Sequence, residues 1–295
     1  MIVDCHTHIW TEPRQLGEGA KEYLARQGRQ ERLLARPQDH ARAAACVDKT
    51  LVLGCQSAHL GADVPNELIA EYVAGHSDRM IGIAAVDPTV AGAAETAGRL
   101  LQQKEFRGLT VNPAGQNFHP ADTRAMEIYE LASRRGVPIL IQQSTPLPTR
   151  GCMEYARPLL LDEIARDFPN LTIVISAMGH PWIDECISLL GKHPRVFSDV
   201  AGLTRRPWQA YNALVSAHQF NVMDKILFGS DFPFSTASEA IEAVYRLHEV
   251  TQGTNLPVVP REMLRGMVER NALEVLGISL PGETPARATE EEEYV

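Results

Sequence analysis

The stretch VDCHTHIW, residues 3–10, sets an aspartate and two histidines at alternate positions in an apolar run at the start of the chain. Successive side chains of an extended strand point to opposite faces, so Asp4, His6 and His8 are predicted to project from one face. Two imidazoles at this spacing can share one metal ion or one substrate. The stretch therefore predicts both a strand and a candidate site.

Seven more apolar, β-branched runs follow, and stretches with helical spacing lie between them. Strands that alternate with helices pair in parallel through right-handed crossovers. Eight of them in 295 residues is the number in a (β/α)₈ TIM barrel. A doubly wound open sheet is the weaker alternative, because no glycine-rich phosphate loop follows any strand. The predicted strands cover residues 1–6, 50–55, 80–86, 106–112, 137–143, 171–177, 195–202 and 225–231.

Helix-end signals mark two of the intervening stretches. Asn66 and Asp122 are predicted to be N-caps, and Gly136 is predicted to be the C-cap of the second helix. Residues 267–278 have the pattern of one closing amphipathic helix. Residues 11–49, rich in Arg, Gln and Glu, are expected to form an insertion after the first strand that can cover the barrel mouth.

The composition is that of an ordinary globular protein, with 44% hydrophobic and 22% charged residues. No linker divides residues 1–280, which are predicted to form a single barrel domain. Residues 281–295 are polar, acidic and without periodicity, so they are expected to form a flexible tail. The chain has 28 basic and 37 acidic residues, and its formal net charge of −9 argues against a nucleic-acid partner.

The expected location is the cytoplasm. No basic n-region precedes a long apolar stretch at the start, and no run approaches the roughly 18 residues of a membrane span. The five cysteines are odd in number and lack paired ligand spacing, as expected of reduced thiols. A small-molecule substrate is the expected partner, and a homodimer is the default oligomer.

The active site of a barrel forms at the C-terminal ends of its strands. His6 and His8 end the first predicted strand and Asp231 ends the eighth, and these strands are neighbours once the barrel closes. The three side chains are predicted to bind one divalent ion, with zinc preferred and manganese second. Asp231 is also predicted to accept a proton from the metal-acidified water. The alternatives are a hydrogen-bonded structural histidine pair, and an N-cap or salt-bridge role for Asp231.

Three further residues complete this first set of candidates. Asp4 lies deeper in the strand and is predicted to orient an imidazole rather than to bind the ion. Arg205, in the loop after the seventh strand, can clamp a carboxylate of the substrate, although surface arginines are commonly solvated. Trp10 is a candidate substrate contact near the mouth, with packing in the core or in a lid as its alternative.

Several motifs resemble one known family. The stretches VDCHTHIW, NELIAEYVAGHSDRMIGIAAVDP, FHPADTRAMEIYELASRRGVPILIQ, ISAMGHPWIDE and FGSDFPF are similar, in this order, to the amidohydrolase-related (amidohydrolase 2) family. That family groups hydrolases and lactonases with nonoxidative decarboxylases such as aminocarboxymuconate semialdehyde decarboxylase. The resemblance spans residues 2–278 and implies a (β/α)₈ barrel with the strand-one histidines and the strand-eight aspartate around one divalent ion.

The sequence departs from the family at two positions. Members usually end strand five with a histidine ligand, where this chain has Gln142, and end strand six with a catalytic histidine, where it has Ala177. Gln142 can offer a carbonyl oxygen to a hard ion or contact the substrate. His180, three residues further on, is predicted to assist as a ligand or an acid; packing at the start of the next helix is its alternative.

The first functional hypothesis is a metal-dependent hydrolase that cleaves a lactone, amide or similar bond of a small anionic substrate. The second is a nonoxidative decarboxylase of an aromatic or enoic acid, and Ala177 argues against its usual acid. A metal-free lactonase and a non-catalytic barrel that binds a ligand are the remaining alternatives. Substrate specificity belongs to the loops, which the sequence pattern does not decode.

Overall fold

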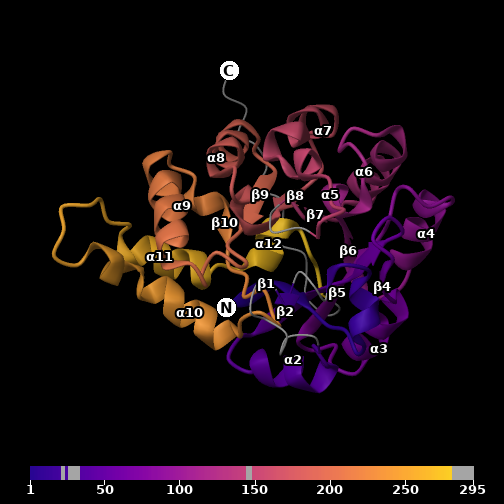
Figure 1. Cartoon of the computed structure of the whole chain (residues 1–295), viewed down its shortest axis with the longest axis horizontal. Helices are drawn as coiled ribbons and strands as arrows, with labels where there is room; N and C mark the ends of the chain where they lie inside the picture. Colours follow the sequence, from indigo (N-terminus) through magenta and orange to yellow (C-terminus); the bar gives the residue numbers. More distant parts are fainter. Residues whose placement is uncertain (21–23, 26–33, 144–147, 281–295) are drawn as a thin grey trace.

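The computed structural model describes residues 1–20, 24–25, 34–143 and 148–280. Its centre is an eight-stranded sheet with the order β1-β2-β5-β6-β7-β8-β9-β10, and every adjacent pair is parallel (Figure 1). All eight predicted strands are present, so the predicted (β/α)₈ barrel is confirmed. The barrel strands are β1 (Val3–His8), β2 (Lys49–Leu53), β5 (Met80–Ala85), β6 (Phe106–Val111), β7 (Ile139–Ile141), β8 (Ile173–Ile175), β9 (Val196–Asp199) and β10 (Ile226–Leu227).

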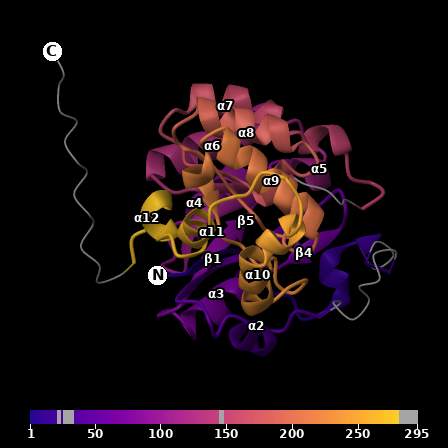
Figure 2. The same cartoon turned by 90° about the vertical axis from the view of Figure 1, so that its left-hand side faces the viewer.

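Helices surround this sheet (Figures 1 and 2). They are α2 (Pro37–Ala43), α3 (Asn66–Ala74), α4 (Ala93–Leu100), α5 (Pro113–Gln116), α6 (Thr123–Arg135), α7 (Asp162–Asp167), α8 (Ile183–Lys192), α9 (Pro207–Gln219), α10 (Ala237–Tyr245), α11 (Arg261–Val268) and α12 (Ala272–Leu276). Short 3₁₀ helices are η1 (Pro13–Leu16), η3 (Met153–Ala156), η4 (Pro158–Leu161), η6 (Met223–Lys225) and η7 (Leu247–Thr251). The segment η5 (Ser176–Gly179) is a turn with non-helical backbone angles. A hairpin of β3 (Cys55–Ser57) and β4 (Ala62–Val64) follows β2.

The barrel closes between β1 and the chain that continues from β10. The backbone N–H of Cys5 donates to the carbonyl of Phe228 at 2.9 Å, and that of His8 donates to Phe232 at 3.0 Å. In the other direction, the N–H of Asp231 donates to the carbonyl of His6, also at 2.9 Å. These bonds bring the last barrel strand beside the first.

A register irregularity in β1, between Asp4 and Thr7, changes which residues face the barrel interior. Val3 and Cys5 pack in the interior cluster, whereas the Thr7 hydroxyl contacts His40 of the outer helix α2. His6 and His8 converge at the mouth, so the single face expected from strict alternation holds for the histidines only. Asp4 bonds instead to the seam with the last strand, as described below.

The interior core is closed at the N-terminal end of the barrel by α12. Inward-facing aliphatic residues of the strands, such as Leu51, Ile83 and Leu227, form one buried cluster with Leu273 and Leu276 of α12. A second and larger cluster fills the layer between the outer faces of the strands and the surrounding helices. The interior is therefore packed with side chains, which leaves the C-terminal mouth as the place for chemistry.

The helix ends confirm some of the predicted caps and contradict another. Asp122 caps α6 by accepting from the N–H of Arg124, and Gly136 ends the helix with φ +64°, as predicted. The Asn66 prediction is wrong, because Pro65 occupies the N-cap and the Asn66 amide pairs with the backbone of Ala85 on β5. The hydrogen bonds of the buried Asn66 carboxamide are satisfied by the backbone of β5 and not by the end of its own helix.

The single closing helix predicted at residues 267–278 is also wrong. Helix α11 ends at Val268, and Asn271 starts α12 by accepting from the N–H of Glu274. A side-chain cap of this kind favours a fresh start over a continuous helix. This break lets α12 pack against the interior cluster of the barrel.

Two sequence predictions fall partly or wholly outside the described residues. Within the expected insertion at residues 11–49, η1 and α2 are described, and Trp10 pairs with Ala35 through their backbones at 3.0 and 3.3 Å. The role of this insertion as a cover of the mouth stays a prediction. The expected flexible tail at residues 281–295 lies outside the described residues. In the part of the chain that is described, no helix is long and apolar enough to cross a membrane.

A fully buried histidine joins β1 to the helices behind it. His40 is 0% exposed and lies 2.8 Å from the Thr7 hydroxyl and 2.7 Å from the Tyr72 hydroxyl. The Thr7 hydroxyl donates to the carbonyl of Leu51, so it accepts from Nε2–H of His40. Burial lowers the pKa of His40 to about 3.

We predict that His40 makes the free energy of unfolding depend on pH. The pKa is about 3 in the folded protein against 6.5 for the ordinary group, so its stabilisation is complete above pH 6.5 and declines as the pH falls towards 3. The contribution to the slope approaches about 1.4 kcal/mol per pH unit. Urea unfolding of His40→Gln between pH 4 and 7 should show a flatter profile than wild type. Tyr72→Phe retains the histidine and should retain the slope; equal slopes for wild type and His40→Gln would contradict the prediction.

Candidate metal centre

Three side chains meet at the C-terminal mouth, where β1 and the chain after β10 lie side by side. His6, His8 and Asp231 each offer one ligand atom, and these atoms lie within 4.8 Å of one another. Nε2 of His6 is 3.1 Å from Nε2 of His8, and the two rings are nearly perpendicular. The structure therefore brings together the three residues predicted as metal ligands.

Hydrogen bonds to the opposite ring nitrogens fix both imidazoles. Nδ1 of His6 lies 2.9 Å from Oδ2 of Asp199, and Nδ1 of His8 lies 3.1 Å from the carbonyl oxygen of Leu53. Both partners accept only, so each Nδ1 carries the proton and donates. The two Nε2 atoms are thereby directed at the same place, which is the donor arrangement that a metal ion requires.

The pKa values of the two histidines are shifted in opposite directions. Burial alone would lower the pKa of His6, but the charge and hydrogen bond of Asp199, with help from Asp231 and Asp4, raise it to about 9. Burial and the neighbouring charge of His6 lower the pKa of His8 to about 4. Like-charge repulsion at 3.1 Å allows only one imidazolium in the pair. A divalent ion between the Nε2 atoms would take the place of that proton.

Asp231 is both a member of this group and an ion-pair partner. Its Oδ2 accepts from Nη1 of Arg205 at 2.6 Å, so the salt-bridge alternative considered for Asp231 is present in the structure. The second carboxylate oxygen, Oδ1, has no partner among the described hydrogen bonds and is the one available to an ion. Asp231 has φ +65°, a backbone conformation that aspartate tolerates better than most residues.

Asp4 bonds to backbone rather than to an imidazole. Its Oδ1 accepts from the N–H of Ser230 at 2.9 Å and from the N–H of His6 at 3.3 Å. Burial raises the pKa of Asp4 to about 6, although these hydrogen bonds oppose the rise. The residue therefore joins β1 to the chain after β10, and the imidazole of His6 is held by another carboxylate.

That carboxylate is Asp199, for which sequence analysis gave no role. It is the last residue of β9, is 0% exposed and lies 193 positions from His6 in the chain. The signal available in the sequence was an aspartate at the end of an apolar barrel strand. Its partner could not be read, because the contact depends on how the strands close around the mouth.

The other predicted site residues lie at different parts of the rim. Gln142 follows β7, and its Oε1 accepts from the Asn112 amide at 3.2 Å. Ala177 lies in η5 after β8, and His180 follows this turn with a lowered pKa, caused by burial and by the charge of Arg206. Among the described residues, the group of convergent ligand atoms does not include His180.

Aromatic side chains form one wall beside the ion pair. The guanidinium of Arg205 lies over the ring of Phe234, 5.4 Å from its centroid, and the Trp10 ring is 6.3 Å from the same phenylalanine. Trp10 is only 3% exposed, which favours its packing alternative. Nε of Arg205 is buried with no hydrogen-bond partner among the described residues.

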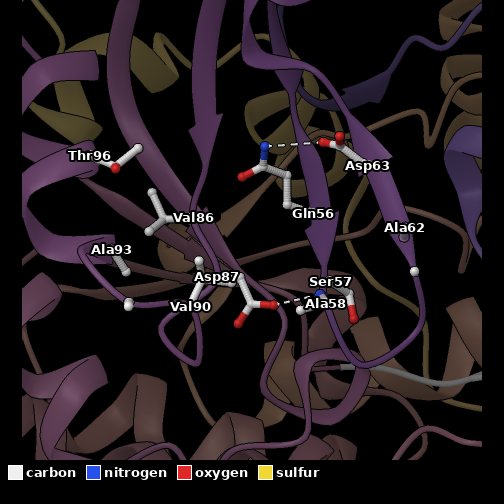
Figure 3. Close-up of a pocket in the computed structure, with 12 residues that line it drawn as sticks. Gln56, Ser57, Ala58, Ala62, Asp63, Val86, Asp87, Val90, Ala93 and Thr96 are labelled. Carbon is white, nitrogen blue, oxygen red and sulfur yellow. Dashed lines mark hydrogen bonds between the residues drawn. The ribbon is translucent and has the colours of Figure 1, made fainter.

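A separate cavity of about 340 Å³ lies between the β3–β4 hairpin and α4 (Figure 3). Apolar side chains such as Val86, Val90 and Ala93 line it. Its buried carboxylate, Asp87, already accepts from the N–H of Ala58, as Figure 3 shows, and from Thr89. None of the convergent ligands lines this cavity.

The family follows from a comparison of the whole sequence. A family model described as amidohydrolase matches residues 3–278, so the chain belongs to the amidohydrolase family. This confirms the resemblance on which the sequence prediction relied, and the chain is an enzyme of the amidohydrolase superfamily. No curated protein matches the sequence.

Solved structures with similar folds include several decarboxylases and a probable hydrolase. A TIM-barrel protein of Bordetella bronchiseptica is 18% identical with a TM-score of 0.68, covering 94% of this chain and 98% of that chain. A dihydroxybenzoic acid decarboxylase of Polaromonas with bound manganese and the inhibitor 2-nitroresorcinol is 16% identical, with a TM-score of 0.66 and coverages of 94% and 97%. A probable 2-pyrone-4,6-dicarboxylic acid hydrolase of Acinetobacter baumannii with bound citric acid is 17% identical, with a TM-score of 0.64 and coverages of 94% and 99%. At these identities the likeness establishes the fold.

Gly229 provides the space in which His6 and Asp199 meet. A Cβ at this position would lie 3.0 Å from Cβ of His6 and 3.5 Å from Cβ of Asp199. We predict that Gly229→Ala lowers the free energy of unfolding by about 1–3 kcal/mol, since the buried neighbours must move apart. Gly98→Ala is the matched control, because nothing lies within 4 Å of its added Cβ in helix α4. Thermal unfolding should show a lower Tm for Gly229→Ala and an unchanged or higher Tm for the control; equal Tm values would contradict the crowding described.

Proposed function

We propose that this chain is a metal-dependent hydrolase that cleaves a lactone, amide or similar bond in a small anionic substrate. The observation that carries the proposal is the convergence of two tautomer-fixed Nε2 atoms and one carboxylate at the barrel mouth. Two imidazoles and a carboxylate suit zinc, and manganese is the second choice. A single open cluster with three protein ligands is typical of a catalytic rather than a structural metal site.

When bound, a divalent ion acidifies water and polarises a carbonyl oxygen. His6 and His8 would hold it through Nε2, and Asp231 through Oδ1. Asp231 would accept the proton of the attacking water, and Arg205 keeps its carboxylate in place by donating to Oδ2. The same side chain would then serve as ligand and as proton acceptor.

The substrate is proposed to be anionic because cationic and donor groups face the same rim. The Arg205 side chain is partly exposed beside the ion pair and would attract a carboxylate of the substrate. Gln142 is proposed to contact the substrate from the opposite strands, and His180 to assist as an acid. Trp10 would contribute by shaping the aromatic wall behind Arg205.

A nonoxidative decarboxylase is the second candidate, favoured by the dihydroxybenzoate decarboxylase among the similar structures. In that reaction a substrate carboxylate departs as carbon dioxide and the carbon takes up a proton. The usual strand-six acid is replaced by Ala177, whose methyl group has no proton to give. His180 would have to supply the proton, and for this reason we rank the decarboxylase second. A metal-free lactonase is the third, in which the charge of Arg205 would polarise the substrate.

The decisive variant for the hydrolase is Asp231→Asn. Removing the proton acceptor should lower kcat/KM by about 10²–10⁴-fold on a lactone substrate found by screening, with the fold retained by circular dichroism. Asp63→Asn, at an exposed carboxylate of β4, is the matched control and should keep wild-type activity. Unchanged turnover by Asp231→Asn would refute the proposed role.

Metal analysis separates the candidates. Protein purified without chelator should carry about one equivalent of zinc or manganese, and the His8→Gln variant should carry much less, because one of the three ligands is gone. Less than a tenth of an equivalent in the wild type, with activity intact, would favour the metal-free lactonase. Carbon dioxide release from hydroxybenzoates, with no hydrolysis of lactones, would favour the decarboxylase.

A further inference from the structure

Asp199 contacts the candidate metal centre through His6 without being one of its convergent ligands. It ends β9, is completely buried, and its two carboxylate oxygens accept three hydrogen bonds. Oδ2 accepts from Nδ1 of His6 at 2.9 Å. Oδ1 accepts from the backbone N–H of Ala177 at 2.8 Å and from that of Ala201 at 2.9 Å. Three donors satisfy the carboxylate without any solvent.

The directions of these bonds follow from the donors around the carboxylate. Backbone N–H groups only donate, so Oδ1 accepts both of their bonds. An ionised Asp199 carries no proton, so Oδ2 accepts as well and Nδ1 of His6 is the donor. The backbone around Asp199 thus dictates which nitrogen of His6 carries a proton.

We propose that Asp199 is a positioning residue that fixes the Nδ1–H state and the ring orientation of His6, and so directs Nε2 to the ion. The part of this inference that concerns the ion rests on the proposed function. Carboxylate partners of this kind raise the affinity of a histidine for a metal, and their loss typically costs 10–100-fold. Whether Nδ1 of His6 carries a proton depends on contacts within the protein and not on a bound ion.

The same carboxylate also holds the turn that follows β8, the strand next to β9. Ala177 and Met178 have φ +52° and +49° and Gly179 has φ +63°, so three successive residues are in the left-handed region. For residues with a side chain this conformation costs of the order of 1–3 kcal/mol each and needs support from the surroundings. The bond from Ala177 N–H to Asp199 is such a support. Asp199 therefore links the position of the His6 ring to that of the turn after β8.

The test is the isosteric variant Asp199→Asn. If the amide oxygen turns to the two backbone N–H groups, its NH₂ faces His6, and Nδ1 must then give up its proton to accept. The opposite orientation would set the NH₂ against two donors and is disfavoured. We expect the dissociation constant for Mn²⁺ or Zn²⁺, measured by chelator competition, to rise about 10–100-fold. In metal-free protein labelled with ¹⁵N-histidine, Nδ1 of His6 should be protonated in wild type and unprotonated in the variant.

Ser198→Ala is the matched control, because Ser198 is adjacent, equally buried and donates to the backbone carbonyls of Ile175 and Asp199 rather than to a side chain of the site. It should lower stability without changing either the metal affinity or the Nδ1 signal. Wild-type affinity in Asp199→Asn together with a protonated Nδ1 would overturn the inference. Should the variant fail to fold, an unprotonated Nδ1 of His6 in the wild-type spectrum would overturn it equally.

The two readouts distinguish this inference from the proposed function. A wild type that binds neither Mn²⁺ nor Zn²⁺, but whose His6 loses the Nδ1 proton on Asp199→Asn, would refute the metal site and support the positioning role. A wild type that binds metal, with the Nδ1 proton and the affinity unaffected by the variant, would do the reverse.

Discussion

The closure of the barrel between β1 and the chain after β10 determines what this protein can do. Residues 6 and 231 are far apart in the sequence, and the hydrogen bond from Asp231 N–H to the His6 carbonyl places them side by side at the mouth. Asp4 reinforces the seam by accepting from the N–H of Ser230. Without this seam the two histidines would be a local pair, and no carboxylate would complete a site around them.

An ion pair lies beside the cluster of convergent ligand atoms at the mouth. With Gln142 and Ala177 in place of histidines, the described cluster of convergent ligands has two imidazoles and one carboxylate. Arg205 adds a positive charge beside Asp231. A substrate anion or a metal ion at this site would interact with that ion pair.

The barrel could be predicted from the sequence because buried parallel strands appear as short apolar runs whatever their partners. His6, His8 and Asp231 could be predicted because strand ends converge in this fold. The irregularity in β1 and the role of Asp199 could not, since each depends on contacts with strands far along the chain. Asn66 failed as a cap for the same reason: a tertiary partner on β5 competed with the local one.

The most direct test of the metal centre is an anomalous difference map from crystals grown with Mn²⁺ and, separately, with Zn²⁺. We predict one strong peak within bonding distance of Nε2 of His6, Nε2 of His8 and a carboxylate oxygen of Asp231. A map with no peak between these three atoms at saturating metal, or with a peak bound by other side chains, would contradict the assignment of this site.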